Sequence, residues 1–282
     1  MRADLLLVEQ GLAPSRSAAQ RLIERGAVRW RLARGETRSS TAPWQQPRKA
    51  GDELPLGCEL QITDDAELRW ASRAGLKLEG ALNHLSALGA LGATGATGAT
   101  GALGTWALDP AGLVALDLGQ STGGFTDVLL ARGARRVVGV DVGHGQLAPR
   151  LRADARVVAI EGLNAREISR SALGPDCPIG GFGLIVGDLS FISQTLVWPA
   201  LVPLLAPSGH LLMLVKPQFE LQPQHIGKNG VVQNAASHAL VEQRLRQAAS
   251  PLHLNVLAWL DSPIAGGDGN REFFILLNRA AP

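Results

Sequence analysis

From Val114 onward, short apolar segments alternate with segments that have the composition of helices. The apolar segments contain few polar residues, which is typical of strands buried on both faces of a parallel sheet. Strands and helices in alternation predict an α/β fold with an open, Rossmann-like sheet covered by helices on both sides. The predicted strands are VALDLG (114–119), RVVGVDV (136–142), VVAIEG (157–162), FGLIVGD (182–188) and HLLMLVK (210–216).

Further segments complete this predicted domain. One helix ends near Ala206, and another covers residues 237–249. The apolar segments LNVLAWL (254–260) and EFFILLN (272–278) follow, and we expect them to add an edge pair of strands to the sheet. A chain of 282 residues has room for this domain and a small companion. The predicted division is a small N-terminal α+β domain (1–66), a connector (67–110) and the α/β domain (111–282).

Charge is distributed unevenly along the chain. Residues 1–50 contain ten Arg and Lys residues and four Asp and Glu residues, so this segment has a formal charge of +6. The whole chain has a formal charge of +2, which leaves −4 for the remainder. A basic segment attached to a mildly acidic body predicts a polyanionic partner.

Cysteine use and the uncharged segments bear on the compartment. Cys58 and Cys177 are the only cysteines, which predicts neither a disulfide framework nor a metal-ligand cluster and favours a reducing, cytoplasmic compartment. The first residues, MRADLLLVEQGL, lack the features of a secretory signal. Residues 85–108 read as a Gly/Ala/Thr-rich low-complexity linker, and prolines interrupt residues 190–215. Neither stretch is therefore predicted to span a membrane.

Two helices followed by a strand are predicted near the N-terminus. Ser15 and Ser17 lie where the second helix, SAAQRLIERG, needs a cap, and Gly26 ends it. The pattern LLVEQGLAPSRSAAQRLIERGAVRW resembles the S4-like RNA-binding module over roughly the first 65 residues, although RLARGETRSSTAPWQQPRK replaces the usual short turn after the second helix. A solvated basic helix is the alternative. The residues expected to contact RNA are Arg16, Arg21, Arg25, Arg29 and Arg73.

A glycine-rich loop follows the first strand of the predicted α/β domain. Its pattern, D-x-G-x-S-T-G-G from Asp117 to Gly124, lies between a strand and a helix start, as nucleotide-type ligands require. The spacing differs from the dinucleotide pattern and from the Lys-containing P-loop, which favours a ligand without phosphate groups. A nicotinamide site and a purely structural loop are the alternatives. Asp141 ends the next strand, where an acid that binds ribose hydroxyl groups is expected.

Two residues of opposite charge, Asp188 and Lys216, end neighbouring predicted strands. Open α/β sheets bind ligands at the carboxyl ends of their strands, so both residues are disposed to act on one bound group. A plain surface ion pair is the alternative.

Five short segments, taken together, resemble the TlyA family over nearly the whole chain. The resemblance implies an S4-like domain joined to an FtsJ-like, S-adenosylmethionine-dependent methyltransferase domain that modifies cytidine ribose hydroxyl groups in ribosomal RNA. Some members of the family are labelled haemolysins. The segments are SRAGLKL (72–78), DLGQSTGGFTD (117–127), GDLSFIS (187–193), LVKPQFE (214–220) and GNREFFI (269–275).

The resemblance also implies site residues. A Lys-Asp-Lys-Glu tetrad falls on Lys77, Asp188, Lys216 and Glu272. The implied cofactor is S-adenosylmethionine, the implied partner is ribosomal RNA or a ribosomal subunit, and no metal is expected. The expected contacts of the cofactor are Asp117, Gly119, Ser121, Thr122, Gly123, Gly124, Asp141 and Asp188.

The chemistry of the reaction explains the tetrad. A ribose 2'-hydroxyl group is a poor nucleophile, so it must be oriented on the methyl group and relieved of its proton. Lys216 is the candidate base, provided that burial or the nearby Lys77 favours its neutral amine. Alternatively, Asp188 and Glu272 orient Lys216, which then stabilises the developing alkoxide as a cation. Asp117 is expected near the ammonium group of the cofactor.

Two residues depart from the family pattern. Ala74 stands where a second glycine is usual, and Gln120 replaces a small residue in the glycine-rich loop. If either damages the cofactor pocket, the chain is an RNA-binding protein with an inactive methyltransferase fold. A membrane-active haemolysin is a further alternative, which the lack of a predicted span disfavours. The insert after Lys77 must loop out for this lysine to reach the site.

Overall fold

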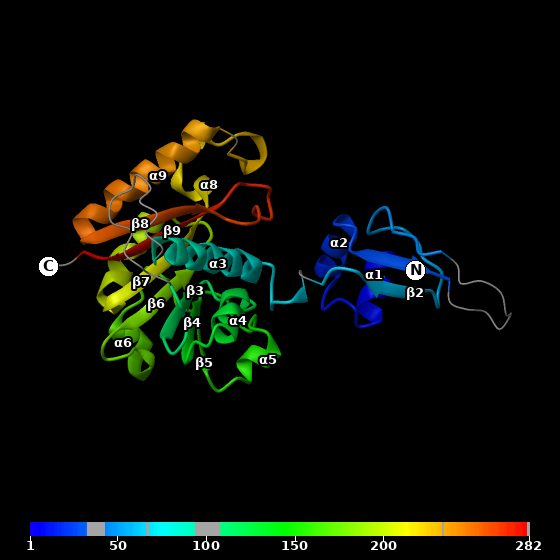
Figure 1. Cartoon of the computed structure of the whole chain (residues 1–282), viewed down its shortest axis with the longest axis horizontal. Coiled ribbons are helices and arrows are strands. Elements are labelled where there is room, and N and C mark those ends of the chain that lie inside the picture. The colour runs from blue at the N-terminus through cyan, green and yellow to red at the C-terminus, as the bar shows by residue number, and fades with distance from the viewer. Residues whose placement is uncertain (33–42, 66–67, 94–107, 233, 281–282) are drawn as a thin grey trace. The chain divides into compact units, whose positions relative to one another are not determined.

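The computed structural model describes two compact units of the chain, residues 1–73 and 74–282 (Figure 1). The described residues are 1–32, 43–65, 68–93, 108–232 and 234–280, with the side chains of all but 89–93 and 228. Most of the predicted Gly/Ala/Thr-rich insert, residues 94–107, lies outside this part of the chain.

The first unit packs two short helices against a two-stranded antiparallel sheet. The hydroxyl group of Ser15 accepts a hydrogen bond from the Ala18 amide (3.2 Å) and so caps the second helix, and Gly26, with a φ of 71°, follows its end. This local structure agrees with the sequence prediction. The elements are α1 (Ala3–Glu9), α2 (Arg16–Glu24), β1 (Val28–Arg31) and β2 (Glu59–Ile62).

The second unit is built around one sheet with the strand order β5-β4-β3-β6-β7-β9-β8 among the described residues. Strands β3 to β7 are parallel, whereas β9 runs antiparallel to both β7 and β8. The predicted α/β sheet with its edge pair of strands is therefore confirmed, and the structure adds that the strands of this pair run antiparallel to their neighbours. The strands are β3 (Val114–Leu118), β4 (Arg136–Asp141), β5 (Val157–Glu161), β6 (Phe182–Gly187), β7 (Leu205–Val215), β8 (Leu254–Asp261) and β9 (Phe273–Arg279).

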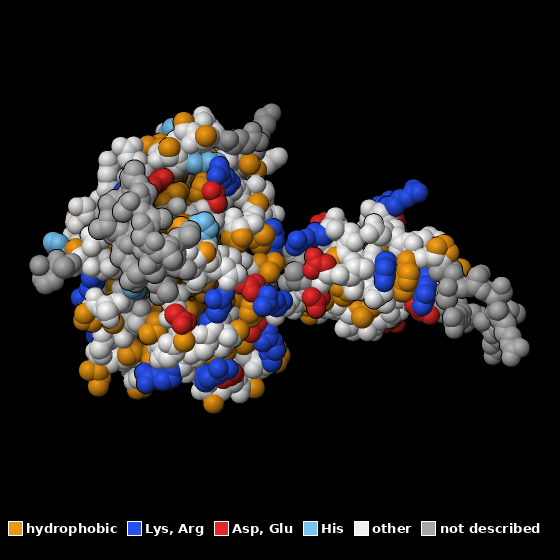
Figure 2. All heavy atoms as spheres, viewed as in Figure 1, with side chains coloured by type: hydrophobic (Ala, Val, Ile, Leu, Met, Phe, Trp, Pro, Cys, Tyr) orange, Lys and Arg blue, Asp and Glu red, His pale blue; other side chains and the backbone are white. Residues whose placement is uncertain are grey.

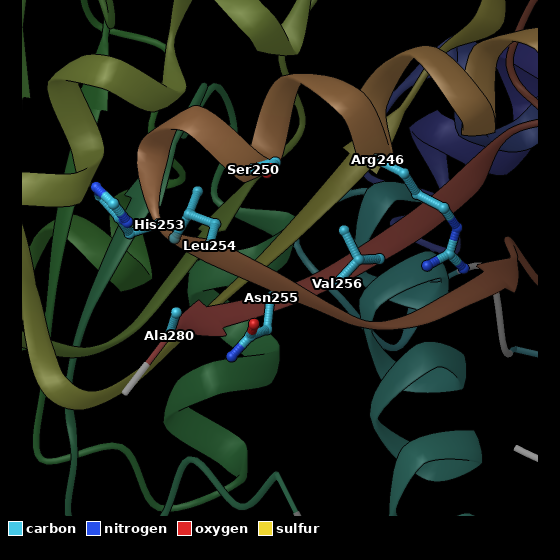
Figure 3. A pocket seen from close by; sticks show the side chains of 7 residues that line it. All are labelled: Arg246, Ser250, His253, Leu254, Asn255, Val256 and Ala280. Atoms are coloured by element: carbon cyan, nitrogen blue, oxygen red, sulfur yellow. The ribbon is translucent and has the colours of Figure 1, made fainter. Parts of the chain in front are cut away.

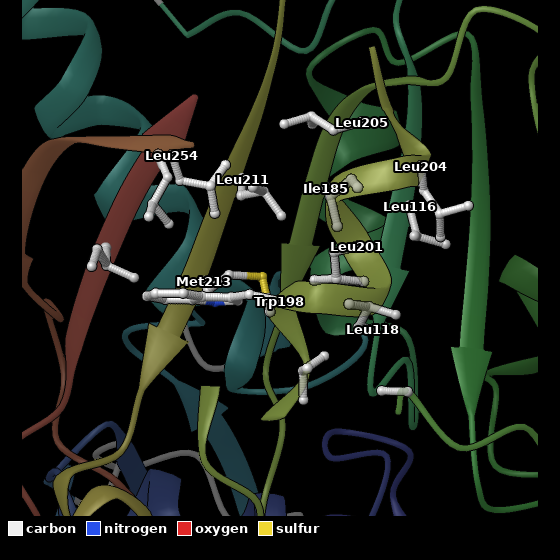
Figure 4. Packing of buried hydrophobic residues seen from close by; sticks show 14 of the residues in the cluster. Leu116, Leu118, Ile185, Trp198, Leu201, Leu204, Leu205, Leu211, Met213 and Leu254 are labelled. Atoms are coloured by element: carbon white, nitrogen blue, oxygen red, sulfur yellow. The ribbon is translucent and has the colours of Figure 1, made fainter. Parts of the chain in front are cut away.

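Alternate residues of the sheet enter cores on its two faces, as the pleat of a strand requires. In β9, Phe273 and Ile275 belong to one large cluster, whereas Phe274 stacks on Phe125 of α4, with ring centroids 6.2 Å apart. In the large cluster, Trp198 of α7 lies near Met213 of β7 (Figure 4). Burial on both faces explains why the strands read as almost continuous apolar segments. The helices are α3 (Ala74–Ala93), α4 (Gly124–Ala131), α5 (Pro149–Arg152), α6 (Arg170–Leu173), α7 (Trp198–Leu201), α8 (Pro217–Glu220) and α9 (Ala235–Ala249).

The helix predicted to end near Ala206 is shorter than expected. Helical turns end at Leu204, and Ala206 lies in β7 because Leu205 already pairs with Phe182 of β6. Pro203 lies in the last helical turn, where its missing N–H group prevents regular helix continuation.

Helix α3 belongs to the second unit, although the sequence analysis placed its residues in the connector. Leu78, Leu82 and Leu85 are spaced at helical intervals and are buried. Gly80 makes a close approach to Pro263, since a Cβ atom at Gly80 would lie 2.6 Å from Pro263 Cγ. Within the described residues, none of the helices is both long and apolar enough to cross a membrane.

Candidate active site

The carboxyl ends of the central strands bring the candidate residues together. Asp188 follows β6, and Lys216 follows β7, which is its parallel neighbour. Glu272 precedes β9, and because β9 is antiparallel to β7, its start lies at the same edge of the sheet. Lys77 reaches this edge from the first turns of α3. Four residues from distant parts of the sequence thus meet at one place.

The four side chains alternate in charge and form a continuous chain of ion pairs. Lys77 Nζ lies 2.6 Å from Glu272 Oε2 and 3.9 Å from Asp188 Oδ2. Lys216 Nζ lies 2.7 Å from Asp188 Oδ1. The side chains of all four are between 3% and 15% exposed, so the group is largely but not completely withdrawn from water.

One residue of this group was not predicted. The hydroxyl group of Ser190 accepts a hydrogen bond from Lys216 Nζ (2.7 Å), next to the contact of the same amine with Asp188. Ser190 follows Asp188 by two residues in the segment GDLSF. A hydroxyl group so close to an acid at a strand end is the sequence feature that could have identified it as a site residue. Burial raises the pKa of the Glu272 carboxyl group, and the positive charge of Lys77 opposes this rise.

The glycine-rich loop lies directly beside the ion pairs. Gly119, with a φ of 74°, approaches Asp188 so closely that a Cβ atom there would lie 2.8 Å from the Asp188 carbonyl oxygen. Gly123, with a φ of 94°, precedes α4, and Gly124 is the first residue of that helix. Residues with side chains at 119 or 123 would be strained, which explains the glycines of the motif.

Asp141 holds the loop from the neighbouring strand. Its carboxylate accepts hydrogen bonds from the amides of Ser121 and Gly143, each at 2.7 Å. The Ser121 hydroxyl group donates to Gln146 Oε1 (3.0 Å). Thr122 is half-buried, and its carbonyl oxygen accepts a hydrogen bond from the Ala148 amide (3.2 Å). The predicted loop residues and Asp141 therefore lie at one edge of the sheet.

Asp117 lies beneath the loop rather than on its surface. It is 0% exposed, and its Oδ2 accepts a hydrogen bond from the Thr126 hydroxyl group (2.7 Å). Burial raises the pKa of this carboxyl group to about 7. In this structure the Asp117 side chain therefore contacts the protein interior beneath the loop.

The unusual Gln120 is also buried beneath the loop. Its amide donates to Thr126 Oγ1 (3.0 Å), and a Cβ atom at position 139 would lie 2.0 Å from the Gln120 side chain. The glycine at position 139 thus leaves the space that Gln120 occupies. Ala74, the other departure from the family pattern, is the first residue of α3.

The arginines predicted to contact RNA belong to the first unit and lie in different surroundings. Arg16 Nε donates to Asp4 Oδ2 at 2.9 Å. The guanidinium group of Arg29 lies over the ring of Trp44 (4.8 Å to the centroid), as does that of Arg31 (4.4 Å). Trp44 belongs to the segment that replaces the usual S4 turn, and the sequence analysis did not single it out. Arg21 lies in α2, Arg25 is the C-cap of α2, and Arg73 is the last residue of the unit.

Lysine and arginine side chains are numerous on the visible surface of each unit (Figure 2). A pocket of about 410 Å³ lies elsewhere, between the end of α9 and the start of β8 (Figure 3). Because Leu254 pairs with Arg279 at the end of β9, this pocket lies at the opposite edge of the sheet from Glu272. It is not part of the candidate active site.

The fold and the site define a class of enzyme, the Rossmann-like methyltransferases of the FtsJ-like type. The FtsJ-like methyltransferase family model matches residues 70–279, and the S4 domain model matches residues 1–29. The 16S/23S rRNA (cytidine-2'-O)-methyltransferase TlyA of Mycobacterium tuberculosis is 38% identical over 98% of this chain and 89% of its own length. The chain belongs to the TlyA family, as its sequence segments indicated.

Two further relatives carry a hemolysin label. Hemolysin A of Brachyspira hyodysenteriae is 32% identical over 97% of this chain and 98% of its own length. A solved structure from Streptococcus thermophilus with this label is 35% identical, with a TM-score of 0.68 and coverage of 99% of this chain and 88% of that one.

Proposed function

We propose that this protein transfers a methyl group from S-adenosylmethionine to the 2'-hydroxyl group of a cytidine in ribosomal RNA. The observation that carries the proposal is the convergence of Lys77, Asp188, Lys216 and Glu272 beside the glycine-rich loop. The name of the M. tuberculosis relative supports the choice of substrate. If ribosomal RNA is the substrate, the protein acts in the cytoplasm and its partner is ribosomal RNA or a ribosomal subunit.

The loop after β3 fits the cofactor. Gly119 and Gly123 provide the positive φ values of the loop and let it pack directly on Asp188 and Leu151, and Asp141 provides an acid at the end of β4. When bound, S-adenosylmethionine supplies a methyl group activated by its sulfonium centre. Gln120 does not argue for an inactive fold, because its side chain is buried between Thr126 and position 139.

Lys216 is placed to act on the ribose oxygen. Its ammonium group donates a hydrogen bond to Ser190 Oγ and forms an ion pair with Asp188 Oδ1, each at 2.7 Å. Because a lysine ammonium group has three N–H donors, a donor remains for the ribose oxygen. These contacts favour Lys216 as a cation that stabilises the developing alkoxide over Lys216 as a base. In the reaction the oxygen–methyl bond forms, the sulfur–methyl bond breaks, and the hydroxyl proton passes to water.

The first unit supplies the proposed RNA-binding surface. Residues 1–50 carry a formal charge of +6, which suits the phosphate backbone. Arg29, Arg31 and Trp44 combine positive charge with an aromatic ring beside β1, and all three are half-buried. RNA-binding proteins use such a combination to contact phosphates and bases. We propose that these residues act together with Arg16, Arg21, Arg25 and Arg73.

The test is methyl transfer by the Lys216→Ala variant. Radiolabelled methyl transfer to ribosomal RNA from cells that lack this protein should fall at least about a hundredfold, since an interaction with developing charge is lost. Cofactor affinity, measured by calorimetry, should change less than about twofold. Arg166→Ala, at an exposed position of the same unit, is the control. Normal transfer by Lys216→Ala would remove Lys216 from the mechanism, and no cofactor binding by the wild-type protein would favour an inactive fold.

A further inference from the structure

Glu220 is a buried acid that the proposed reaction does not use. It is the last residue of α8, four residues after Lys216, and it is only 2% exposed. A buried carboxylate is costly unless its oxygen atoms are hydrogen-bonded, so its partners indicate what it does.

Both oxygen atoms of Glu220 bind the segment that carries Asp188. Oε2 accepts a hydrogen bond from the Ser193 hydroxyl group (2.6 Å), and Oε1 accepts one from the backbone amide of Gln194 (2.7 Å). These residues begin the 3-10 turn η3 (Gln194–Leu196), and Ser193 is its N-cap. Glu220 therefore anchors the end of the segment 188–194, which we call the β6 loop.

A third hydrogen bond ties the β6 loop to the chain on the N-terminal side of Lys216. The side chain of Gln194, itself 2% exposed, donates from Nε2 to the carbonyl oxygen of Leu214 (2.9 Å). Leu214 precedes Lys216 by two residues, and Glu220 follows it by four. The β6 loop is thus held on both sides of the lysine that pairs with Asp188 and Ser190.

The β6 loop needs such an anchor because its backbone is unusual. Phe191 has a φ of 63°, a conformation that non-glycine residues rarely adopt, and its side chain is 89% exposed. The exposed ring contributes little burial, and it contacts Phe219 of α8, the residue before Glu220, with ring centroids 5.0 Å apart. The hydrogen bonds of Ser193 and Gln194 to Glu220, two and three residues after Phe191, oppose relaxation of its backbone.

We propose that Glu220 is a positioning residue that holds the β6 loop in the conformation in which Asp188 and Ser190 orient Lys216. Glu220 does not touch the reacting atoms and acts through the loop. Arg244 of α9 donates a hydrogen bond to the carbonyl oxygen of Glu220 and so ties the end of α8 to α9. The expected effect of Glu220 on kcat rests on the proposed function. The expected effect of Glu220 on the order of the β6 loop does not.

The experiment compares Glu220→Gln with Glu167→Gln, which makes the same change at an exposed position of the same unit. In Glu220→Gln the size and the acceptor for the Gln194 backbone amide are kept, but the charge-assisted bond from Ser193 is replaced by a weaker neutral one in which the Ser193 hydroxyl group accepts. Amide hydrogen exchange in residues 188–196 should accelerate at least about tenfold in Glu220→Gln alone, which corresponds to the loss of about 1.4 kcal/mol of protection. Methyl transfer should show a kcat lowered by about tenfold or more and a cofactor affinity within about twofold.

Ser193→Ala is the second variant, which removes the bond to Glu220 Oε2 together with the contacts of the same hydroxyl group with Thr195. It should show the same changes in exchange and in kcat, and it replaces Glu220→Gln if that variant does not fold. Unchanged exchange in residues 188–196 in a folded variant would overturn the proposal, as would faster exchange with an unchanged kcat. If the wild-type protein shows no methyl transfer, the proposed function fails, whereas the exchange measurement still decides whether Glu220 orders the β6 loop.

Discussion

At the scale of single residues, the site is a set of charges that can be buried only together. Lys77, Asp188, Lys216 and Glu272 carry two positive and two negative charges, and each contacts an opposite charge. Removal of Lys77 leaves Glu272 without an ionic partner, and removal of Asp188 does the same to Lys216, which costs several kcal/mol for a buried charge in general. The geometry of the site is therefore most sensitive to these two members.

Asp117 provides a test of burial at this scale. Its pKa of about 7 in the folded protein exceeds the ordinary value of 3.8, so the folded state binds the proton more tightly than the unfolded state. The stability that this proton contributes is present below pH 4 and is lost as the pH rises to about 7. Asp117→Asn keeps an acceptor for Thr126 without the charge.

We expect the free energy of unfolding of the wild-type protein to fall relative to Asp117→Asn by as much as roughly 1.4 kcal/mol per pH unit in this range. Urea unfolding at pH 4.5 and pH 7 measures the difference. A gap between the two proteins that does not change with pH would show that Asp117 is ionised throughout.

At the scale of secondary-structure elements, α3 and the loop after β8 place two members of the tetrad. Lys77 lies on α3, Glu272 ends the loop that begins after Asp261, and Gly80 of the helix contacts Pro263 of the loop. Asn270, which is fully buried, holds the same loop by donating to the Gly230 carbonyl oxygen (2.9 Å). The short Lys77–Glu272 distance therefore depends on how closely two elements pack.

Gly80→Ala tests this packing. In an ordinary helix the change stabilises by up to about 1 kcal/mol, because alanine favours the helix. Here the added Cβ atom would lie 2.6 Å from Pro263 Cγ. We expect the free energy of unfolding to fall by about 1–3 kcal/mol instead, together with a lower kcat. Urea unfolding and methyl transfer are the measurements, with His84→Ala on the exposed face of α3 as the control. A more stable Gly80→Ala variant would contradict the close contact.

At the scale of the whole molecule, positive charge is concentrated in the first 50 residues, which lie in the first unit. These residues have a formal charge of +6 and the remainder of the chain −4. A basic segment binds polyanions through its field without reading their sequence, whereas the second unit contains the residues proposed to react. The affinity for RNA should therefore depend on the salt concentration more strongly than the affinity for the cofactor.

A change in salt concentration distinguishes RNA binding from cofactor binding. Raising the salt concentration from about 50 to about 200 mM should weaken binding of ribosomal RNA at least about tenfold, because bound counterions are released from the phosphates. Cofactor affinity should change less than about twofold under the same conditions. Arg29→Gln with Arg31→Gln should reduce the salt dependence, measured by filter binding, whereas Arg166→Gln should not. Equal salt dependence in all three proteins would exclude the β1 surface from RNA binding.

Much of the fold follows from local patterns in the sequence. The strands from Val114 onward are recognisable because burial on both faces requires nearly continuous apolar residues, and the cap at Ser15 is recognisable because a hydroxyl group there satisfies a free amide. The early start of β7 and the extent of α3 were not predicted, since pairing with Phe182 and packing against Pro263 involve residues distant in the sequence.

The sequence by itself determined the order of the strands and helices, the glycine-rich loop and the residue types of the tetrad, because these depend on backbone preference and on family resemblance. Only the tertiary structure decided that Asp117 and Gln120 lie beneath the loop, that Ser190 joins Lys216, and that Glu220 anchors the β6 loop. These hydrogen bonds join residues 6 to 27 positions apart, so they depend on how strands and turns are placed in space. A local pattern carries no record of that placement.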